Sequence, residues 1–341
     1  MKTTFVSTIT LWNSPRSSLD KMQTELVKAN KELALGRHAD VGLKLGYRTG
    51  ETISLRQEMA ELDALIDSNA TVKVRLDATT AALASMRETS EKFRASLISG
   101  PVADRNMDVL QSEATANLDA LLADLNKQVN GQYIFGGINT QEKPMKDFLT
   151  NAKMAIEAEF AGQFASVPAA DITAAQMDAF LDGAFAAVFD DANWTAEWTN
   201  ASTKSIQSSV STSDRIATSV SAQEVAFRNL AKSYTMIMAI GLDALNSETR
   251  THVVSRVVST ISRAAVQVAD LEAKIGSAKN TMLASNDRMS LQKYIFEERL
   301  AKFEGVDAAE AKVRVDHLAT QIQVSFQLTA QLRNLSLVNF I

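Results

Sequence analysis

Residues Val254–Met289 read VSRVVSTISRAAVQVADLEAKIGSAKNTMLASNDRM, and this stretch decides the architecture of the 341-residue chain. Small or apolar residues recur here at alternating spacings of three and four: Val254, Val257, Ile261, Ala264, Val268, Leu271, Ile275, Ala278, Met282, Ser285 and Met289. This is the heptad pattern of a helix that packs against another helix along its length. Taken from Thr249 to about Leu300, the helix would be roughly 75–80 Å long at about 1.5 Å per residue. A compact domain does not need such a helix, so the stretch predicts a helical rod.

A second long helix is expected from about Ile53 to Ile98. Its stripe keeps the same alternation: Val72, Leu76, Thr79, Leu83, Met86, Ser90, Phe93 and Leu97. Ser99-Gly100-Pro101 follows in the order that commonly ends a helix. Two long helices with the same pattern, one in each half of the chain, indicate that the chain runs out along a rod and returns.

Shorter elements are predicted around these two helices. Helices are expected at about Asn106–Val129 and Ser221–Leu245, and the interruption Glu304-Gly305-Val306-Asp307 precedes a final helix. The glycine-rich stretch from Gly36 to Gly50 predicts a hinge or irregular connector. Tyr133-Ile134-Phe135-Gly136-Gly137 predicts a strand or one arm of a hairpin.

The heptad pattern disappears between about Thr140 and Ser213. Trp194 and Trp198 alternate with Ala196 as in a strand, and Ala174–Phe189 is amphipathic as in a helix. Burial of both tryptophans in a small core is favoured over a ligand-binding role. The fold expected is therefore mainly α, a long coiled-coil helical rod built from the N- and C-terminal flanks, with a short β-hairpin and a small inserted mixed α/β domain. We predict a terminal assembly domain (1–45 with 306–341), a rod domain (46–139 with 214–305) and a variable outer domain (140–213).

The two ends of the chain are almost uncharged. Residues 318–341 contain one charged side chain, Arg333, and residues 1–15 contain one, Lys2. Because chain ends are usually polar, these apolar segments predict an assembly interface that partner helices cover. Its expected residues are Leu19, Met22, Leu26, Leu33, Leu318, Ile322, Phe326, Leu332 and Leu335. The alternative is that the two ends pack only on each other within one molecule.

Composition excludes several classes of protein. The chain has 35 basic and 40 acidic residues, a formal net charge of -5, which gives no reason to expect nucleic acid or an anionic membrane as a partner. It has no cysteine, so disulfides and thiolate metal sites are excluded. No apolar run is long enough to cross a membrane, and no cleavable signal peptide is expected.

No residue pattern indicates chemistry. His38, His252 and His317 lie far apart in the sequence and lack ligands at metal spacing. The paired carboxylates Glu297-Glu298 and Asp190-Asp191 are more typical of solvated faces than of acid–base dyads. We therefore expect no catalytic, cofactor-binding or metal site, no cofactor and no enzyme activity.

One short motif resembles a known family. The segment Asn130-Gly131-Gln132-Tyr133-Ile134-Phe135-Gly136-Gly137-Ile138-Asn139-Thr140 resembles the "NG-x-YIF-x-G-x-x-T" run of flagellar hook–filament junction proteins, also called hook-associated protein 3. The residues that match it are Asn130, Gly131, Tyr133, Ile134, Phe135, Gly137 and Thr140. Residues 305–310 and 330–340 resemble the start of that family's terminal helix and its closing stretch, while the connector after Leu35-Gly36-Arg37 departs from the family's turn. Residues 140–213 match nothing recognisable.

The resemblance implies a structural part of the bacterial flagellum, exported unfolded by the flagellar type III route and located outside the cell. It implies self-association into a ring, contact with a neighbouring hook-associated protein and flagellin, and a cytoplasmic export chaperone that shields the C-terminal segment. Two alternatives stay open: a minor flagellin that polymerises in the filament, and a soluble cytoplasmic coiled-coil adaptor or signalling protein.

Overall fold

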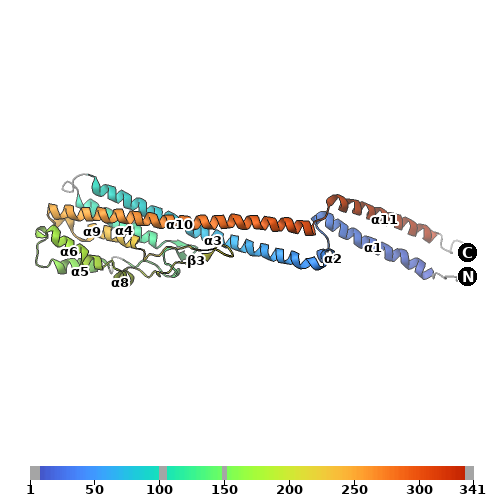
Figure 1. The fold of residues 1–341 in the computed structure, drawn as a ribbon, viewed down its shortest axis with the longest axis horizontal. Coiled ribbons are helices and arrows are strands. Elements are labelled where there is room, and N and C mark those ends of the chain that lie inside the picture. The colour runs from blue at the N-terminus through green and yellow to red at the C-terminus, as the bar shows by residue number, and fades with distance from the viewer. Residues whose placement is uncertain (1–7, 100–105, 148–151, 335–341) are drawn as a thin grey trace. The chain divides into compact units, whose positions relative to one another are not determined.

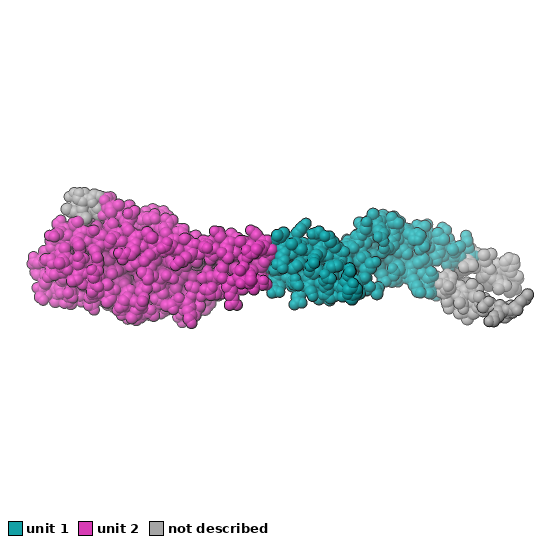
Figure 2. Space-filling view, viewed as in Figure 1, with its two compact units in different colours: residues 1–63, 290–341 teal, residues 64–289 magenta. Residues whose placement is uncertain are grey.

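The computed structural model describes residues 8–99, 106–147 and 152–334, with the backbone alone for residues 8–15, 152 and 332–334. The described parts are mainly helical (Figure 1). They divide into two compact units, residues 1–63 with 290–341 (unit 1) and residues 64–289 (unit 2), which Figure 2 colours separately. The long helices α3 and α10 contribute residues to both units.

In chain order, the elements are α1 (Thr8–Leu35), α2 (Val41–Leu45), η1 (Gly46–Arg48), α3 (Thr49–Ile98), α4 (Met107–Leu125), β1 (Gln128–Val129), β2 (Gln132–Tyr133), α5 (Ala152–Gln163), η3 (Ala169–Asp171), α6 (Ala174–Asp182), α7 (Ala184–Ala187), α8 (Asp191–Asn193), η4 (Trp194–Trp198), β3 (Gln207–Ser209), β4 (Arg215–Ala217), α9 (Val225–Ala239), η5 (Leu242–Ala244), α10 (Ser247–Glu304) and α11 (Ala308–Asn334). The helices expected at the two heptad stretches and after Asp307 are present as α3, α10 and α11, and α10, with 58 residues, is longer than predicted.

Within unit 2, α3 and α10 pack antiparallel through the predicted stripes. Partner numbers fall along α10 as they rise along α3: Asp77 pairs with Lys279 at 2.5 Å and Arg87 with Glu272 at 3.1 Å. Hydrogen bonds from Lys279 and Lys73 lower the pKa of the Asp77 carboxyl. The residues of the two stripes that are buried are Leu76, Thr79, Leu83, Met86, Ser90, Phe93, Leu97, Val254, Val257, Ile261, Ala264, Val268, Leu271, Ile275, Met282, Ser285 and Met289.

Helices α4 and α9 complete the core of unit 2. They pack against each other, and Phe227, Leu230 and Tyr234 of α9 are buried. The Tyr234 ring meets Phe93 of α3 edge to face, with the ring centroids 5.4 Å apart. This burial, together with the nearby Glu113 carboxylate, raises the pKa of the Tyr234 phenol well above its usual range. Helix α9 therefore joins the inserted region to the long helix pair.

The inserted region is built on a chain of aromatic contacts. Trp194 and Trp198 are both buried and stack with their ring centroids 4.9 Å apart. The predicted strand at these tryptophans is wrong, because Trp194–Trp198 forms a π-helical turn. The same W-x-A-x-W spacing also places residues four apart on one helical face, and Asp190 caps the preceding helix through the Asn193 amide. Strand periodicity alone was therefore ambiguous here.

A glycine also divides the helix predicted at Ala174–Phe189. It ends after α6 at Gly183, whose N–H donates to the Ala179 carbonyl at 3.0 Å, and α7 follows as a separate short helix. A Cβ on Gly183 would lie only 2.7 Å from the Ala179 oxygen. The close backbone approach therefore explains both the break and the glycine.

Candidate assembly surface

Helix α1 ends and helix α11 begins at one pair of bridged backbone segments in unit 1. Arg37 forms an antiparallel bridge with Gly305, and the Val306 N–H donates to the Gly36 carbonyl at 3.1 Å. Gly36 has a φ of 66°, and a Cβ on Gly305 would lie 2.3 Å from the Ala301 carbonyl oxygen, so both positions favour glycine. The predicted interruption before the final helix is confirmed. The predicted irregular connector is partly wrong, because residues 41–48 form α2 and η1.

Helices α1 and α11 then pack along each other (Figure 1). Ala29 of α1 and Ala311 of α11 are buried, and such small side chains allow two helix backbones to approach closely. Most of the predicted interface residues lie on the same faces as these alanines and are half-buried: Leu19, Met22, Leu26, Leu33, Leu318 and Ile322. The described parts of α1 and α11 therefore pack on each other, but this contact leaves these six side chains only half-buried.

The carboxylate of Glu32 anchors the base of this helix pair. It accepts from the Arg314 guanidinium at 3.2 Å and from the Ala39 N–H at 3.1 Å, and the His38 imidazole lies 3.6 Å away. Glu304, itself buried, forms an ion pair with Arg56 of α3. Both carboxylates are shielded from water while their arginine partners are about half exposed, and the Glu32 contacts tie the end of α1 to α11 and to the connector.

A second apolar face of α11 points away from α1. Val313 and Val324 lie on the side of the helix opposite Ala311. Leu328, four residues after Val324, lies on the flank of that side, and Phe326 lies at the edge of the α1 contact. All four are 46–68% exposed. Burying what remains of their surface would contribute roughly 4 kcal/mol per chain, at about 2 kcal/mol for a full side chain. One neighbouring helix cannot cover two opposite faces of α11. The uncovered face is a candidate contact surface for another molecule, and we call it the outer face of α11.

The Asn130–Gly137 motif forms the hairpin that the sequence predicted. Strands β1 and β2 pair antiparallel, and the two-residue turn between them has positive φ at Asn130 (51°) and Gly131 (75°). Asn-Gly is the favoured sequence for such a turn because both residues tolerate this conformation. Ile134 and Phe135 are buried directly after the hairpin. The Tyr133 N–H donates to the Thr140 carbonyl at 2.9 Å and closes the following loop.

The glycine pair of the motif, Gly136-Gly137, lies in close contact with neighbouring backbone atoms. A Cβ on Gly137, which has a φ of 62°, would lie 2.4 Å from the Ser202 carbonyl oxygen. One on Gly136 would lie 2.4 Å from the Asn139 oxygen. The Gly136 carbonyl also accepts from the Ser202 N–H at 3.0 Å. These motif residues therefore hold the inserted region against the hairpin.

Bacterial flagellin is the family whose helical regions match the two ends of this chain. The model of the bacterial flagellin N-terminal helical region matches residues 6–140, and that of the C-terminal helical region matches residues 258–341. Together they cover more than half of the sequence. The chain belongs to the flagellin-like family of flagellar proteins. It is thus a structural component of the flagellum. The resemblance of the Asn130–Thr140 motif had pointed to a narrower group, the hook–filament junction proteins.

Two solved structures of flagellar proteins are among the structural matches to this chain. A proposed flagellar hook-associated protein from Vibrio parahaemolyticus is 12% identical, with a TM-score of 0.47 over 75% of this chain and 98% of its own. FlgL from Bacillus cereus is 9% identical, with a TM-score of 0.39 over 75% of this chain and 97% of its own. No curated protein sequence matches the flagellin-like chain.

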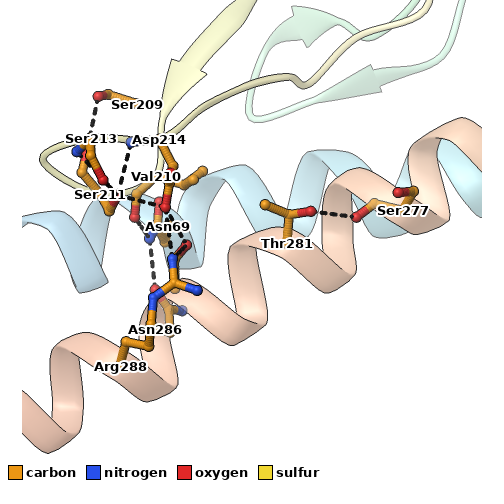
Figure 3. A network of polar contacts seen from close by, with 11 residues as sticks. Asn69, Ser209, Val210, Ser211, Ser213, Asp214, Ser277, Thr281, Asn286 and Arg288 are labelled. Atoms are coloured by element: carbon orange, nitrogen blue, oxygen red, sulfur yellow. Dashed lines mark hydrogen bonds and ion pairs between the residues drawn. The ribbon is translucent and has the colours of Figure 1, made fainter.

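A polar network holds the turn between β3 and β4 on the long helices of the flagellin-like chain (Figure 3). The Asn69 side-chain amide donates to the Val210 carbonyl at 2.8 Å and to the Asn286 side chain at 2.6 Å. The Asp214 carboxylate accepts from Arg288 at 2.7 Å and from the Ser211 hydroxyl at 3.0 Å. This network joins residues far apart in sequence and has no heptad signal, so the sequence did not predict it.

Two of the predicted interface residues lie beyond what the structure describes. The side chain of Leu332 and the whole of Leu335 are outside the described residues, so their part in an interface stays a prediction. Val313, Val324 and Leu328 were not among the predicted interface residues, because the heptad stripe of the C-terminal segment follows another face of the helix. The signal that was available is the excess of apolar residues over what one stripe requires.

Within residues 8–99, 106–147 and 152–334, no three His, Asp or Glu side chains gather as a metal site requires. His252 instead forms a hydrogen bond with Asp178 at 2.8 Å. Among those same residues, no helix has the length and apolar character needed to cross a membrane.

Proposed function

We propose that this flagellin-like protein forms the junction between the flagellar hook and filament and adapts one to the other mechanically. Subunits would associate as a short ring, with α1 and α11 inward and the inserted region outward. The observation that supports this proposal is the uncovered outer face of α11 beside the α1 contact, because it requires further helices to bury it. The assembly interface proposed from the sequence and this outer face would then be covered by different neighbours.

The motif at Asn130–Thr140 favours a junction protein over other members of the family. Its resemblance is to hook–filament junction proteins, and its asparagine–glycine turn and glycine pair have the structural uses described above. Immunogold labelling of intact cells tests the proposal. A single band of label where the hook meets the filament is expected, and label along whole filaments would refute it.

The partners proposed are copies of the chain, a neighbouring hook-associated protein and flagellin. We also propose export by the flagellar type III route, with a chaperone on the C-terminal segment before export. The absence of cysteine suits that route, because no disulfide can form a loop in the exported chain. The three-part division into a terminal assembly domain, a rod domain and an outer domain (140–213) belongs to the same proposal.

A minor flagellin is the second candidate function. The matches to both flagellin helical regions favour it, and they also weigh against the cytoplasmic adaptor alternative. A flagellin polymerises into long filaments, whereas a junction protein stops at a short assembly. Electron microscopy of the purified chain after addition of salt separates the two. Long filaments would favour the flagellin, and their absence would favour the junction protein.

A further inference from the structure

Asn69 is a polar residue in a row of α3 that otherwise consists mostly of leucine. The row repeats every seven residues, and its side chains are at most 5% exposed: Leu55, Leu62, Asn69, Leu76, Leu83, Ser90 and Leu97. Asn69 is fully buried, and among the described residues its side-chain oxygen has no hydrogen-bond partner. A buried asparagine in such a row makes a helix pair less stable than an apolar residue would. Stability of the helix pair therefore does not explain this residue.

The side-chain amide of Asn69 binds two different elements (Figure 3). It donates to the Val210 carbonyl, in the turn between β3 and β4, at 2.8 Å and to the Asn286 side chain of α10 at 2.6 Å. Val210 is also fully buried, and a buried carbonyl without a donor is unfavourable. Asn69 thus joins α3, α10 and the tip of the β3–β4 hairpin, residues 210–214, at one level of the long helices.

Ser90, the other polar residue of the row, makes a different kind of contact. Its hydroxyl donates to the Arg87 carbonyl of the same helix at 2.7 Å. A serine can satisfy its polar group within its own helix in this way. Asn69 differs because its printed hydrogen bonds go to residues 141 and 217 positions away in the sequence.

Away from its tip, the hairpin does not pack closely on α10. A cleft of about 440 Å³ opens between β4 with the residues that follow it and α10. Its apolar lining residues include Ile216, Val220, Leu271 and Ile275. The level at which the hairpin lies on α10 therefore depends mainly on the contacts of its tip.

Of the contacts of the tip, the Asn69 hydrogen bond is the one that is both buried and directional. Burial of the Val210 side chain favours docking, but apolar burial is non-directional and does not select a level. Asp214 accepts from Arg288 at 2.7 Å, but the Arg288 side chain is 64% exposed, and exposed ion pairs contribute little. The Ser285 hydroxyl is 3.4 Å from the Asp214 carboxylate, which is a long hydrogen bond.

We propose that Asn69 is a positioning residue, which selects the level at which the β3–β4 hairpin docks on the long helices. Its amide recognises the backbone carbonyl of Val210, and the second bond, to Asn286, orients the amide. The hairpin lies between the inserted region and α9 in the chain, so docking it at one level fixes where that region joins the rod. This role goes beyond the proposed function and does not rest on it, because it concerns the folded free chain.

An Asn69→Leu variant of the purified full chain tests the proposal. Hydrogen exchange followed by mass spectrometry reports on the tip, and urea unfolding followed by circular dichroism reports on the helices. A two-stranded hairpin is only marginally stable alone, so a tip that leaves the helices also loses its own hydrogen bonds. We expect the amides of residues 209–214 to exchange at least about tenfold faster, because the Val210 carbonyl loses its donor. The urea midpoint should equal or exceed that of the wild type, because a leucine completes the apolar row.

Two control variants separate this role from general effects. Ser90→Ala removes the other polar side chain of the row and should leave exchange at the tip unchanged, since its hydroxyl bonds only within α3. Arg288→Ala removes the exposed ion pair of the tip and should speed exchange there by less than about fivefold. The order expected for exchange at the tip is therefore Asn69→Leu fastest, then Arg288→Ala, then Ser90→Ala.

Every other outcome for Asn69→Leu contradicts the proposal. Unchanged exchange at the tip would show that other contacts select the docking level. Faster exchange together with a lower urea midpoint, or failure of the variant to fold, would make Asn69 an ordinary support of the core. These results are measured on the free chain, so they leave the proposed junction role untouched, and failure of that role in cells leaves this inference untouched.

Discussion

Substitution of Leu328 by aspartate should block assembly while leaving the free chain nearly unchanged. Leu328 lies on the outer face of α11 and is 53% exposed, so about half of its roughly 2 kcal/mol burial energy is still to be gained in an assembly. An aspartate loses this contribution of about 1 kcal/mol and must also be desolvated, at a cost of several kcal/mol. The combined loss of at least about 3 kcal/mol corresponds to more than a hundredfold weaker association.

The assay is the amount of the chain in flagella isolated from cells that lack the wild-type protein. Leu328→Asp should be nearly absent from them, whereas Leu328→Met, which keeps an apolar side chain at the same site, should be present at the wild-type level. The melting temperature of the purified chain should not differ between these variants, because unit 2 does not contain the site. Wild-type incorporation of Leu328→Asp would refute the assignment of this face to an interface.

Three further predictions concern the inner contact and the core. Ile322→Asp, on the half-buried side of α11, should block assembly while the long helices α3 and α10 stay folded by circular dichroism; normal swimming with full-length filaments would contradict this. Phe93→Ala should lower the free energy of unfolding by about 3–5 kcal/mol, because Phe93 is fully buried, and denaturant unfolding measures this; a change below about 1 kcal/mol would show that the site is poorly packed. The pKa of the Tyr234 phenol is raised in the folded chain, whereas the unfolded chain releases this proton near the ordinary pKa of about 10. The contribution of this group to stability is therefore complete below about pH 10 and is lost as the pH rises toward the folded-state pKa. Tyr234→Phe should remove that alkaline loss in urea titrations at pH 9 and 11, and an identical loss in both proteins would assign it to other groups.

The long helices could be predicted from the sequence because their signal is local and repeated. The stripe from Val254 to Met289 follows from the heptad pattern alone. Gly305 marks the end of α10, because a Cβ at this position would lie too close to the Ala301 carbonyl oxygen. The hairpin could be predicted for a similar reason, since Asn130-Gly131 favours a tight turn. These features depend on neighbours in the chain.

Features that depend on residues far apart in the sequence were either not predicted or predicted wrongly. Trp194 and Trp198 fit both a strand and a helical turn, and only their stacking within the aromatic core decides between them. The hydrogen bond from Asn69 to Val210 joins residues 141 positions apart, which no periodicity can indicate. The sequence also could not predict which apolar face of α11 packs against α1, because a heptad pattern does not identify the partner of each face.

Hydrogen exchange of residues 308–334 tests the central claim most directly. Mass spectrometry would compare these amides in the dilute free chain and in isolated flagella. We predict that they exchange at least about a hundredfold more slowly in flagella, because neighbours cover the outer face of α11 there. Equal protection in both samples would show that this helix gains nothing from assembly and would contradict the account.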